Sequence, residues 1–173
     1  MVLSVHTLVG GALGATLGAS PITSFVVGFA SHYLLDAIPH ADYPKQSLQK
    51  NKGDRTKDFI TTDGRFAHDI VVNGIDLILG FLVLVSLTYK SSLIWSVIAG
   101  AIGACTPDGL QFLHLMFPKI KILDIFPRIH AFFHTPLNIE EHMEKYPVVS
   151  VALQGVILAV SLISILRIIP VPF

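Results

Sequence analysis

Residues 70–89 read IVVNGIDLILGFLVLVSLTY, and Asp76 is the only acidic or basic residue among them. A helix needs about 20 apolar residues to cross the hydrocarbon core of a bilayer, so this run has the required length. Because it has no charged face to turn toward water, it predicts a membrane-spanning helix. Four further apolar segments approach the same length: Val2–Ala19, Ile22–Ile38, Leu93–Phe117 and Val148–Ile169. We therefore expect an all-α fold, a polytopic membrane helical bundle with about five transmembrane helices.

The composition agrees with a membrane protein. Of the 173 residues, 52% are hydrophobic and only 14% are charged, whereas a soluble domain of this size needs a larger charged surface. The formal net charge is +0, which argues against a nucleic-acid partner, since such proteins carry a basic excess. The single cysteine, Cys105, excludes an internal disulfide and a zinc site built on several cysteines. No internal repeat divides the chain, so we expect residues 1–173 to form one integral membrane domain.

The distribution of basic residues indicates the orientation in the membrane. Two long polar connections, Pro39–Ala67 and Pro118–Pro147, hold ten of the twelve Lys and Arg residues, and only Lys90 and Arg167 lie on the other side. By the positive-inside rule we expect a multi-pass protein of the inner (plasma) membrane, with its N-terminus and both connections in the cytoplasm and its C-terminus outside. Residues 119–128 mix apolar with basic side chains, which predicts one interfacial helix.

Small residues recur at the spacing of helix contacts. Gly10, Gly14 and Gly18 lie four residues apart in the first segment, and this spacing lets two helices approach closely in lipid. Residues 99–104 of the fourth segment, AGAIGA, offer a matching surface. Such small-residue faces would also suit a homo-oligomer. The Ser-Pro pair at residues 20–21 predicts a tight turn, because proline suits the start of a helix, so the first two segments should form a helical hairpin.

The histidines and acidic residues gather toward one membrane face. On the expected topology all eight histidines and all twelve acidic residues lie at or near the cytoplasmic side. At least five of them enter the helices: His6, His32, Asp36, Asp76 and Asp108. A charge at the centre of a membrane helix costs roughly 2.5–3.5 kcal/mol, so buried acids are usually paired or bound to a cation. Since Arg167 at the far end is the only Lys or Arg within the helices, we expect a metal ion as the counter-charge.

The sharpest local pattern is HYLLDAIPH at residues 32–40. His32 and Asp36 are four residues apart, so both side chains project from one helical face. Pro39 interrupts the helix directly afterwards, which allows His40 to turn back toward the same centre. A neutral imidazole and a carboxylate at this spacing can bind one zinc ion or bridge two. The alternative is a His–Asp hydrogen bond that only satisfies the two groups.

The third segment repeats this arrangement. Asp69, Asn73 and Asp76 lie four and three residues apart, along one stripe of the helix. Asp76 would be a metal ligand, or an acceptor that orients a ligating histidine. Asp69 would be a free carboxylate that serves as the general base.

Two patterns in the second half of the chain offer further ligands. The Thr-Pro pair at residues 106–107 predicts a break in the fourth helix, since threonine suits an N-cap and proline the next position. Asp108 would then line a polar cavity at the break, or only cap the new helical piece. His130 and His134 are four residues apart, as in histidine pairs that clamp a metal on a helix. The alternative is an interfacial helix without a metal.

These motifs resemble two families of hydrolases. His32 to Asp36, followed by Pro39 and His40, is similar to the His-x-x-x-Asp…Pro-x-His element of zinc-dependent phospholipase C and the S1/P1 nucleases. Those are all-helical enzymes that hydrolyse phosphodiesters with a cluster of zinc ions. The resemblance implies zinc binding and phosphoester hydrolysis.

The whole chain more closely resembles the YdjM-like bacterial inner-membrane proteins, which are classed as metal-dependent hydrolases. That family shows an early histidine followed by glycines, a Ser-His-x-x-x-Asp helix, a Pro-Asp element and a paired-histidine segment. The matching positions here are residues 6–10, residues 31–36, residues 107–108, and the pair His130 and His134. The resemblance implies a metal-dependent hydrolase in the membrane.

We therefore expect a membrane-embedded hydrolase that uses one or two Zn²⁺ ions to activate water for attack on a phosphoester at the cytoplasmic face. The expected metal ligands are His6, His32, Asp36, His40, Asp76, Asp108, His130 and His134, and the expected catalytic base is Asp69. Membrane lipid is the expected partner, and lipid phosphoesters are natural substrates because the site opens at headgroup depth.

The competing class is a non-enzymatic membrane protein, either a small metal or proton transporter or a structural partner. Proton relays also use buried histidine and aspartate. A transporter should carry polar residues along its whole path, whereas the outer halves of the segments are apolar apart from Ser, Thr and Gln154. This difference favours the hydrolase.

Overall fold

The computed structural model of the chain describes residues 1–18, 20–38, 40, 42–51, 54–134 and 147–169. Its α-helices are α1 (Leu3–Leu17), α2 (Pro21–Asp36), α3 (Gly64–Thr88), α4 (Ile94–Met116), α5 (Ile125–His134) and α7 (Pro147–Ile168). Two short 3₁₀ turns, η1 (Arg55–Lys57) and η2 (Lys121–Asp124), lie in the long connections. Two-residue strands β1 (Leu48–Gln49) and β2 (Phe59–Ile60) pair antiparallel, with Leu48 opposite Ile60. The expected all-α class is confirmed, and each of the five apolar segments is a helix.

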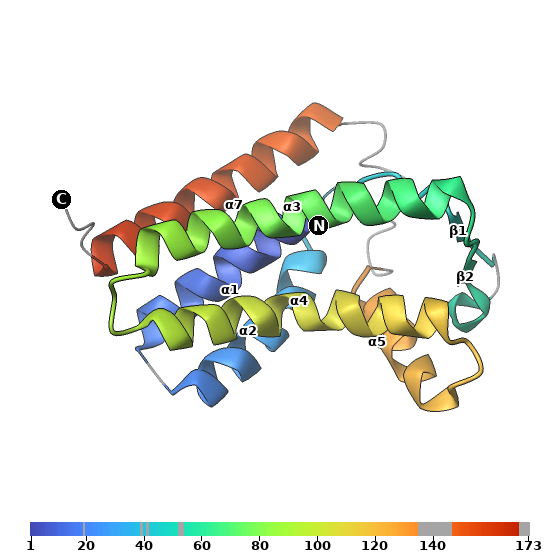
Figure 1. The fold of residues 1–173 in the computed structure, drawn as a ribbon, viewed down its shortest axis with the longest axis horizontal. Helices are drawn as coiled ribbons and strands as arrows, with labels where there is room; N and C mark the ends of the chain where they lie inside the picture. Colours follow the sequence, from blue (N-terminus) through green and yellow to red (C-terminus); the bar gives the residue numbers. More distant parts are fainter. Residues whose placement is uncertain (19, 39, 41, 52–53, 135–146, 170–173) are drawn as a thin grey trace.

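Helix α1 is the centre of the bundle and packs against α2, α3, α4 and α7 (Figure 1). Its Leu8 and Ala12 join Leu84 of α3, Val97 of α4 and Ile165 of α7 in one buried apolar core. Burial of such side chains stabilises a fold by roughly 1.5–3 kcal/mol each when they leave water. The core therefore holds α3, α4 and α7 in place around α1.

Close backbone contact between α1, α2 and α4 depends on glycine. A Cβ on Gly10 of α1 or on Gly28 of α2 would collide with the carbonyl of Gly100 in α4, and one on Gly14 would collide with that of Ser96. The predicted match between the first and fourth segments is therefore confirmed. Gly18 plays a different part, because it ends α1 in the left-handed region with φ of 52°, a conformation that glycine adopts without steric cost.

The predicted helical hairpin of α1 and α2 is confirmed. The Ser20 hydroxyl accepts a hydrogen bond from the Thr23 amide at 3.3 Å, and Pro21 occupies the first position of α2. Both features are standard for a helix start, since the cap satisfies a free amide and proline has none to satisfy. The hairpin places the start of α1 beside the end of α2.

The number of spans differs from the expectation. Among the described residues, two helices are long and apolar enough to cross a membrane: α3, with 25 residues, and α7, with 22. Helices α1 and α2 have 15 and 16 residues, short of the roughly 20 that a crossing needs. The structure therefore supports a helical bundle but not five spans. Only 11% of the most apolar window of α3 and 22% of that of α7 is buried, so both helices turn apolar faces outward.

The predicted break at Pro107 is wrong. Helix α4 runs continuously through Pro107, and the Thr106 hydroxyl donates to the Ile102 carbonyl at 2.7 Å instead of capping a new helix. A proline within a helix frees one carbonyl, and neighbouring helices and hydroxyl groups can support the turn. Here α2 packs so closely that a Cβ on Gly103 would meet the Phe25 carbonyl.

Both long polar connections lie at the same end of the helices, and the short turns lie at the other (Figure 1). Helix α3 starts at Gly64, earlier than the apolar run, because the Asp63 carboxylate caps it by accepting from the Arg65 amide at 3.0 Å. Residues 119–128, where an interfacial helix was expected, hold the η2 turn and only the start of α5. Phe133 of α5 stacks on Tyr33 of α2 with ring centroids 5.1 Å apart. This contact brings α5 to the end of α2, where the polar cluster lies.

Candidate metal centre

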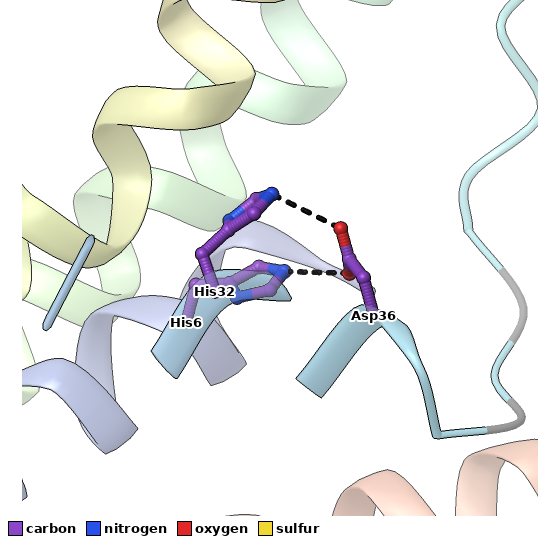
Figure 2. Close-up of side chains that lie close together, drawn as sticks. All are labelled: His6, His32 and Asp36. Atoms are coloured by element: carbon purple, nitrogen blue, oxygen red, sulfur yellow. Dashed lines mark ion pairs between the residues drawn. The ribbon is translucent and has the colours of Figure 1, made fainter. Parts of the chain in front are cut away.

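Asp36 is the hub of a buried polar cluster. Its side chain is 1% exposed, and imidazole nitrogens from three elements and one connection face its two oxygens. The Nε2 atoms of His32 and His130 lie 3.0 and 3.5 Å from Oδ2, and those of His6 and His40 lie 3.3 and 3.7 Å from Oδ1. Figure 2 shows His6 of α1 and His32 of α2 pointing at the two Asp36 oxygens. Four of the predicted ligands thus meet around a fifth.

The backbone sets the tautomer of two of these histidines. His32 Nδ1 lies 2.9 Å from the Ala104 carbonyl, and His40 Nδ1 lies 2.7 Å from the Ile38 carbonyl. A carbonyl only accepts, so both Nδ1 atoms carry the hydrogen. In the neutral ring, Nε2 then presents a lone pair toward Asp36. This is the arrangement of metal-binding histidines, whose second nitrogen donates to a carbonyl or carboxylate.

His6 has the least satisfied side chain of the cluster. It is fully buried, and neither of its ring nitrogens has a hydrogen-bond partner among the described residues. Its ring stacks on that of His32, with centroids 4.2 Å apart. Two stacked, buried imidazoles cannot both carry a charge without a large desolvation and repulsion cost. The His6 nitrogens beside the Asp36 carboxylate are therefore buried polar atoms that a bound cation would satisfy.

Asp108 extends the cluster toward the surface. It lies on α4 one turn after Ala104, its Oδ1 is 3.9 Å from His32 Nε2, and its side chain is 23% exposed. Two overlapping groups offer ligand atoms that all lie within 4.8 Å of one another: His6, His32 and Asp36, and His32, Asp108 and His130. Ligand atoms bound at about 2.0 Å to one tetrahedral zinc lie roughly 3.3 Å apart. The distances of 3.0–3.7 Å between the four histidine Nε2 atoms and the Asp36 oxygens are close to this value.

Two groups that the sequence reasoning did not include also reach Asp36 and His40. The α-amine of Met1 lies 3.1 Å from Asp36 Oδ1 and 2.7 Å from Asp42 Oδ1. Burial would raise the pKa of Asp42, but the amine and Lys45 outweigh it and hold that pKa well below its usual range. Burial, together with the same amine, lowers the pKa of His40, which keeps its imidazole neutral, as a metal ligand requires. The buried carboxylate thus has one cationic neighbour that a count of Lys and Arg misses.

The structure does not bring Asp69 or Asp76 into this cluster. Asp76 accepts a hydrogen bond from the Ser4 amide at 2.9 Å and so caps the first turn of α1. Asp69 accepts from the Gln46 amide at 3.1 Å, and from the amide and hydroxyl of Ser47 at 2.8 and 2.7 Å. Both aspartates on α3 therefore hold backbone amides, and at Asp69 the half-exposed His68 also places its Nδ1 3.4 Å from Oδ1.

The remaining predicted residues divide between described and undescribed parts. His40 lies beside Asp36 as expected, while Pro39 lies outside the described residues. His130 reaches the cluster from α5, and the side chain of His134 lies outside the described part of the chain. His40 and His130 line a pocket of about 490 Å³ together with Asp42. The cluster is therefore reachable from outside the bundle.

The sequence could predict these contacts only where both residues lie at a fixed spacing on one helix. His32 and Asp36 could be paired that way, whereas Asp42 carries no pattern that marks it. No protein-family model, curated protein or solved structure matches this chain.

Proposed function

We propose that the chain is a membrane-embedded, metal-dependent hydrolase whose metal centre is built on Asp36. The observation that carries this proposal is the convergence of His6 and His32 on Asp36, with their buried Nε2 atoms lacking hydrogen-bond partners among the described residues. A single cation placed there would satisfy several lone pairs at once. The donor set of imidazole nitrogen and carboxylate oxygen suits Zn²⁺, as one ion or two.

The alternative of a protonated His–Asp network fits the geometry less well. His32 donates through Nδ1 to Ala104, so an Nε2 hydrogen bond to Asp36 would require a charged ring stacked on His6. A neutral His6 could donate from only one nitrogen, and neither of its nitrogens meets an acceptor in hydrogen-bond geometry. Burial of charge without full pairing is costly. A bound metal removes this cost because it accepts lone pairs directly.

The chemistry suited to this site is hydrolysis of a phosphoester. When bound, Zn²⁺ lowers the pKa of a coordinated water to about 7 and polarises a phosphoryl oxygen. The water oxygen forms a bond to phosphorus, the bond from phosphorus to the leaving oxygen breaks, and one proton passes from the water to the leaving alcohol. Asp108 is the partly exposed carboxylate beside His32 and is placed to carry that proton. Asp69, whose oxygens already accept three hydrogen bonds, is less suited to do so.

The membrane setting is part of the same proposal. Outward apolar faces on α3 and α7 favour contact with lipid, and the polar connections at one end of the bundle hold most of the basic residues. The positive-inside rule then places this end in the cytoplasm. The resemblance to YdjM-like inner-membrane proteins supports the same location and chemistry. The cluster would lie near the depth of the lipid headgroups.

The test is the zinc content of detergent-purified protein, measured by elemental analysis on matched histidine variants. Among the described residues, His6 and His114 are both 0% exposed and both have unpartnered ring nitrogens, but His114 lies beside Asp124 alone and belongs to no group of three metal-ligating side chains. We expect about one or two zinc ions per parent chain, a large loss in His6→Gln, and no change in His114→Gln. Equal zinc content in the two variants would refute the site. Hydrolysis of a chromogenic phosphoester should follow zinc content across the same series.

A proton or metal transporter is the second candidate. Helices α1 and α4 meet beyond the cluster through Leu8, Ala12, Ala15, Val97 and Ala101, a dry apolar core in the described part of the chain. Transport needs polar groups along the whole path. The apolar core therefore favours the hydrolase, and zinc or proton flux into liposomes that depends on Asp36 would reverse this preference.

A further inference from the structure

Two pockets of different character meet at the mouth of the Asp36 cluster. The first has a volume of about 340 Å³ and reaches Asp108, and the second has a volume of about 490 Å³ and reaches His40 and His130. The pockets share the lining residues Asp42, Tyr43, Lys45, Leu48 and Gln111. The two pockets are therefore adjacent, and residues of the cluster line both: Asp108 lines the first, and His40 and His130 line the second.

The first pocket is an apolar cleft between α3 and α4. Its walls include Phe66, Ile70 and Leu77 of α3 and Phe112 and Leu115 of α4. Helix α3 packs more on α1 than on α4, which leaves the cleft open. Ile70 is 44% exposed and Phe112 is 38% exposed, so the cleft opens on the outward apolar face. A hydrocarbon chain could enter it without crossing water.

The second pocket is lined by cationic side chains. Lys45, Lys50 and Arg55 border it, with Asp42 and Asp58 as the acidic residues. Arg55 Nη1 lies 4.0 Å from Asp58 Oδ2, which holds the guanidinium at the wall. Lysine and arginine are the residues that recognise phosphate, as a point charge and as a planar fork. A divalent cation at the Asp36 cluster would add positive charge to the same space.

We propose that the site takes a lipid phosphate: a molecule with one phosphate ester group and a long hydrocarbon chain. The chain lies in the α3–α4 cleft, and the phosphate lies in the second pocket, within reach of Lys50, Arg55 and the metal centre. This assignment of a substrate class rests on the proposed function. It adds that the hydrocarbon is bound by the protein itself, so chain length should govern affinity.

Substitution of a glycine that lines the cleft by a large residue would fill it. Gly74 lines it, and a Cβ there would meet no atom within 4 Å. Gly155 of α7 has the same open surroundings and does not line the cleft. Gly74→Trp should therefore occupy the hydrocarbon site, while Gly155→Trp serves as its matched control. A second matched pair tests the phosphate. Lys50 lines the second pocket, and its control is Lys57, an exposed lysine of the same connection that pairs with Asp54.

The experiment measures the affinity of the zinc-treated full chain, in nanodiscs of neutral lipid, for butyl, octyl and dodecyl phosphate. Each methylene that becomes buried should tighten binding about fourfold, so we expect octyl phosphate to bind at least about tenfold more tightly than butyl phosphate. Gly74→Trp should abolish this gain with chain length, and Gly155→Trp should keep it. Lys50→Gln should weaken binding of all three phosphates several-fold, and Lys57→Gln should not. Partition into the lipid is common to each variant and its control.

Three results would overturn the assignment. Equal chain-length dependence in Gly74→Trp and Gly155→Trp would place the hydrocarbon elsewhere. Equal affinity for dodecanol and dodecyl phosphate would show that the phosphate group is not recognised. An equal loss of phosphate affinity in Lys50→Gln and Lys57→Gln would show that the phosphate does not bind in the second pocket. Zinc measured on the same samples reports separately on the proposed function. Protein that lacks zinc but binds lipid phosphate in the cleft refutes the metal-dependent hydrolase, whereas protein that keeps zinc without chain-length dependence refutes only the lipid assignment.

Discussion

Two buried aspartates at the same end of the bundle, Asp36 and Asp69, have different surroundings. Asp69 faces three hydrogen-bond donors from Gln46 and Ser47, which tie the first long connection to α3, and one imidazole nitrogen, His68 Nδ1, at 3.4 Å. Asp36 faces four imidazole nitrogens and the Met1 amine. Burial and charge are alike in the two residues, so these properties do not identify a metal ligand. The proposed metal centre rests instead on the atoms that face the carboxylate, which at Asp36 are mainly imidazole nitrogens and at Asp69 mainly amide and hydroxyl donors.

Asp36→Asn gives the largest expected effect. The amide lacks the negative charge that balances a zinc ion, and its nitrogen cannot coordinate as a carboxylate oxygen does. Loss of a partner that only supports a ligand costs about 10–100-fold in metal affinity, and loss of the central ligand should cost at least as much. Elemental analysis after dialysis should find almost no zinc, and phosphoester hydrolysis should disappear. A variant that retains the zinc content of the parent would break the distinction between the two aspartates.

Asp69→Asn should have the complementary effect. One amide oxygen can replace only part of the three hydrogen bonds, and the charge that strengthens them is lost. We expect a loss of about 1–3 kcal/mol in the free energy of unfolding, measured as a lower melting temperature in detergent at about 2–4 °C for each kcal/mol. Zinc content per folded chain should equal that of the parent. Loss of zinc with unchanged melting temperature would show that the roles of Asp36 and Asp69 are reversed.

The smallest expected effect concerns pH and sharpens the account of the Asp36 surroundings. Burial and the Met1 amine lower the pKa of His40 in the folded chain, so the unfolded chain binds more protons near the usual value of about 6.5. The resulting stability is fully present above about pH 6.5 and is lost as the pH falls through the folded pKa. Zinc-free protein should therefore melt at a lower temperature at pH 5 than at pH 7.5, and His40→Gln should reduce this difference. An identical pH dependence in parent and variant would remove His40 from the buried cluster.

The sequence predicted those parts of the molecule that local periodicity decides. Apolar runs located all five long helices, and the four-residue spacing of Gly10 and Gly14 located the contact with α4. The spacing of His32 and Asp36 placed both on one face of α2. Each of these inferences follows from a repeat of about 3.6 residues within one helix.

Other predictions failed because they depend on the neighbours of a helix. Helix α4 continues through Pro107 where it packs against α2, and α1 and α2 are capped at Gly18 and Ala37, before the ends of their apolar runs. The stripe of Asp69 and Asp76 was predicted correctly as a pattern, but the groups that face it come from Ser47 and from the start of α1. A count of Lys and Arg along the sequence likewise omits the Met1 α-amine, which lies 3.1 Å from Asp36 Oδ1.

By itself, the sequence determined that the chain forms apolar helices, that α1 and α4 can touch through glycine, and that His32 and Asp36 lie on one face of a helix. These properties depend on residues within one or two helical turns. Only the tertiary structure decided that His6, His40 and His130 meet at Asp36, that Asp69 and Asp76 instead hold backbone amides, and that an apolar cleft lies beside a cationic pocket next to them. The physical reason is that a carboxylate takes its role from atoms within about 3–4 Å, and in a bundle those atoms come from segments far apart in the chain.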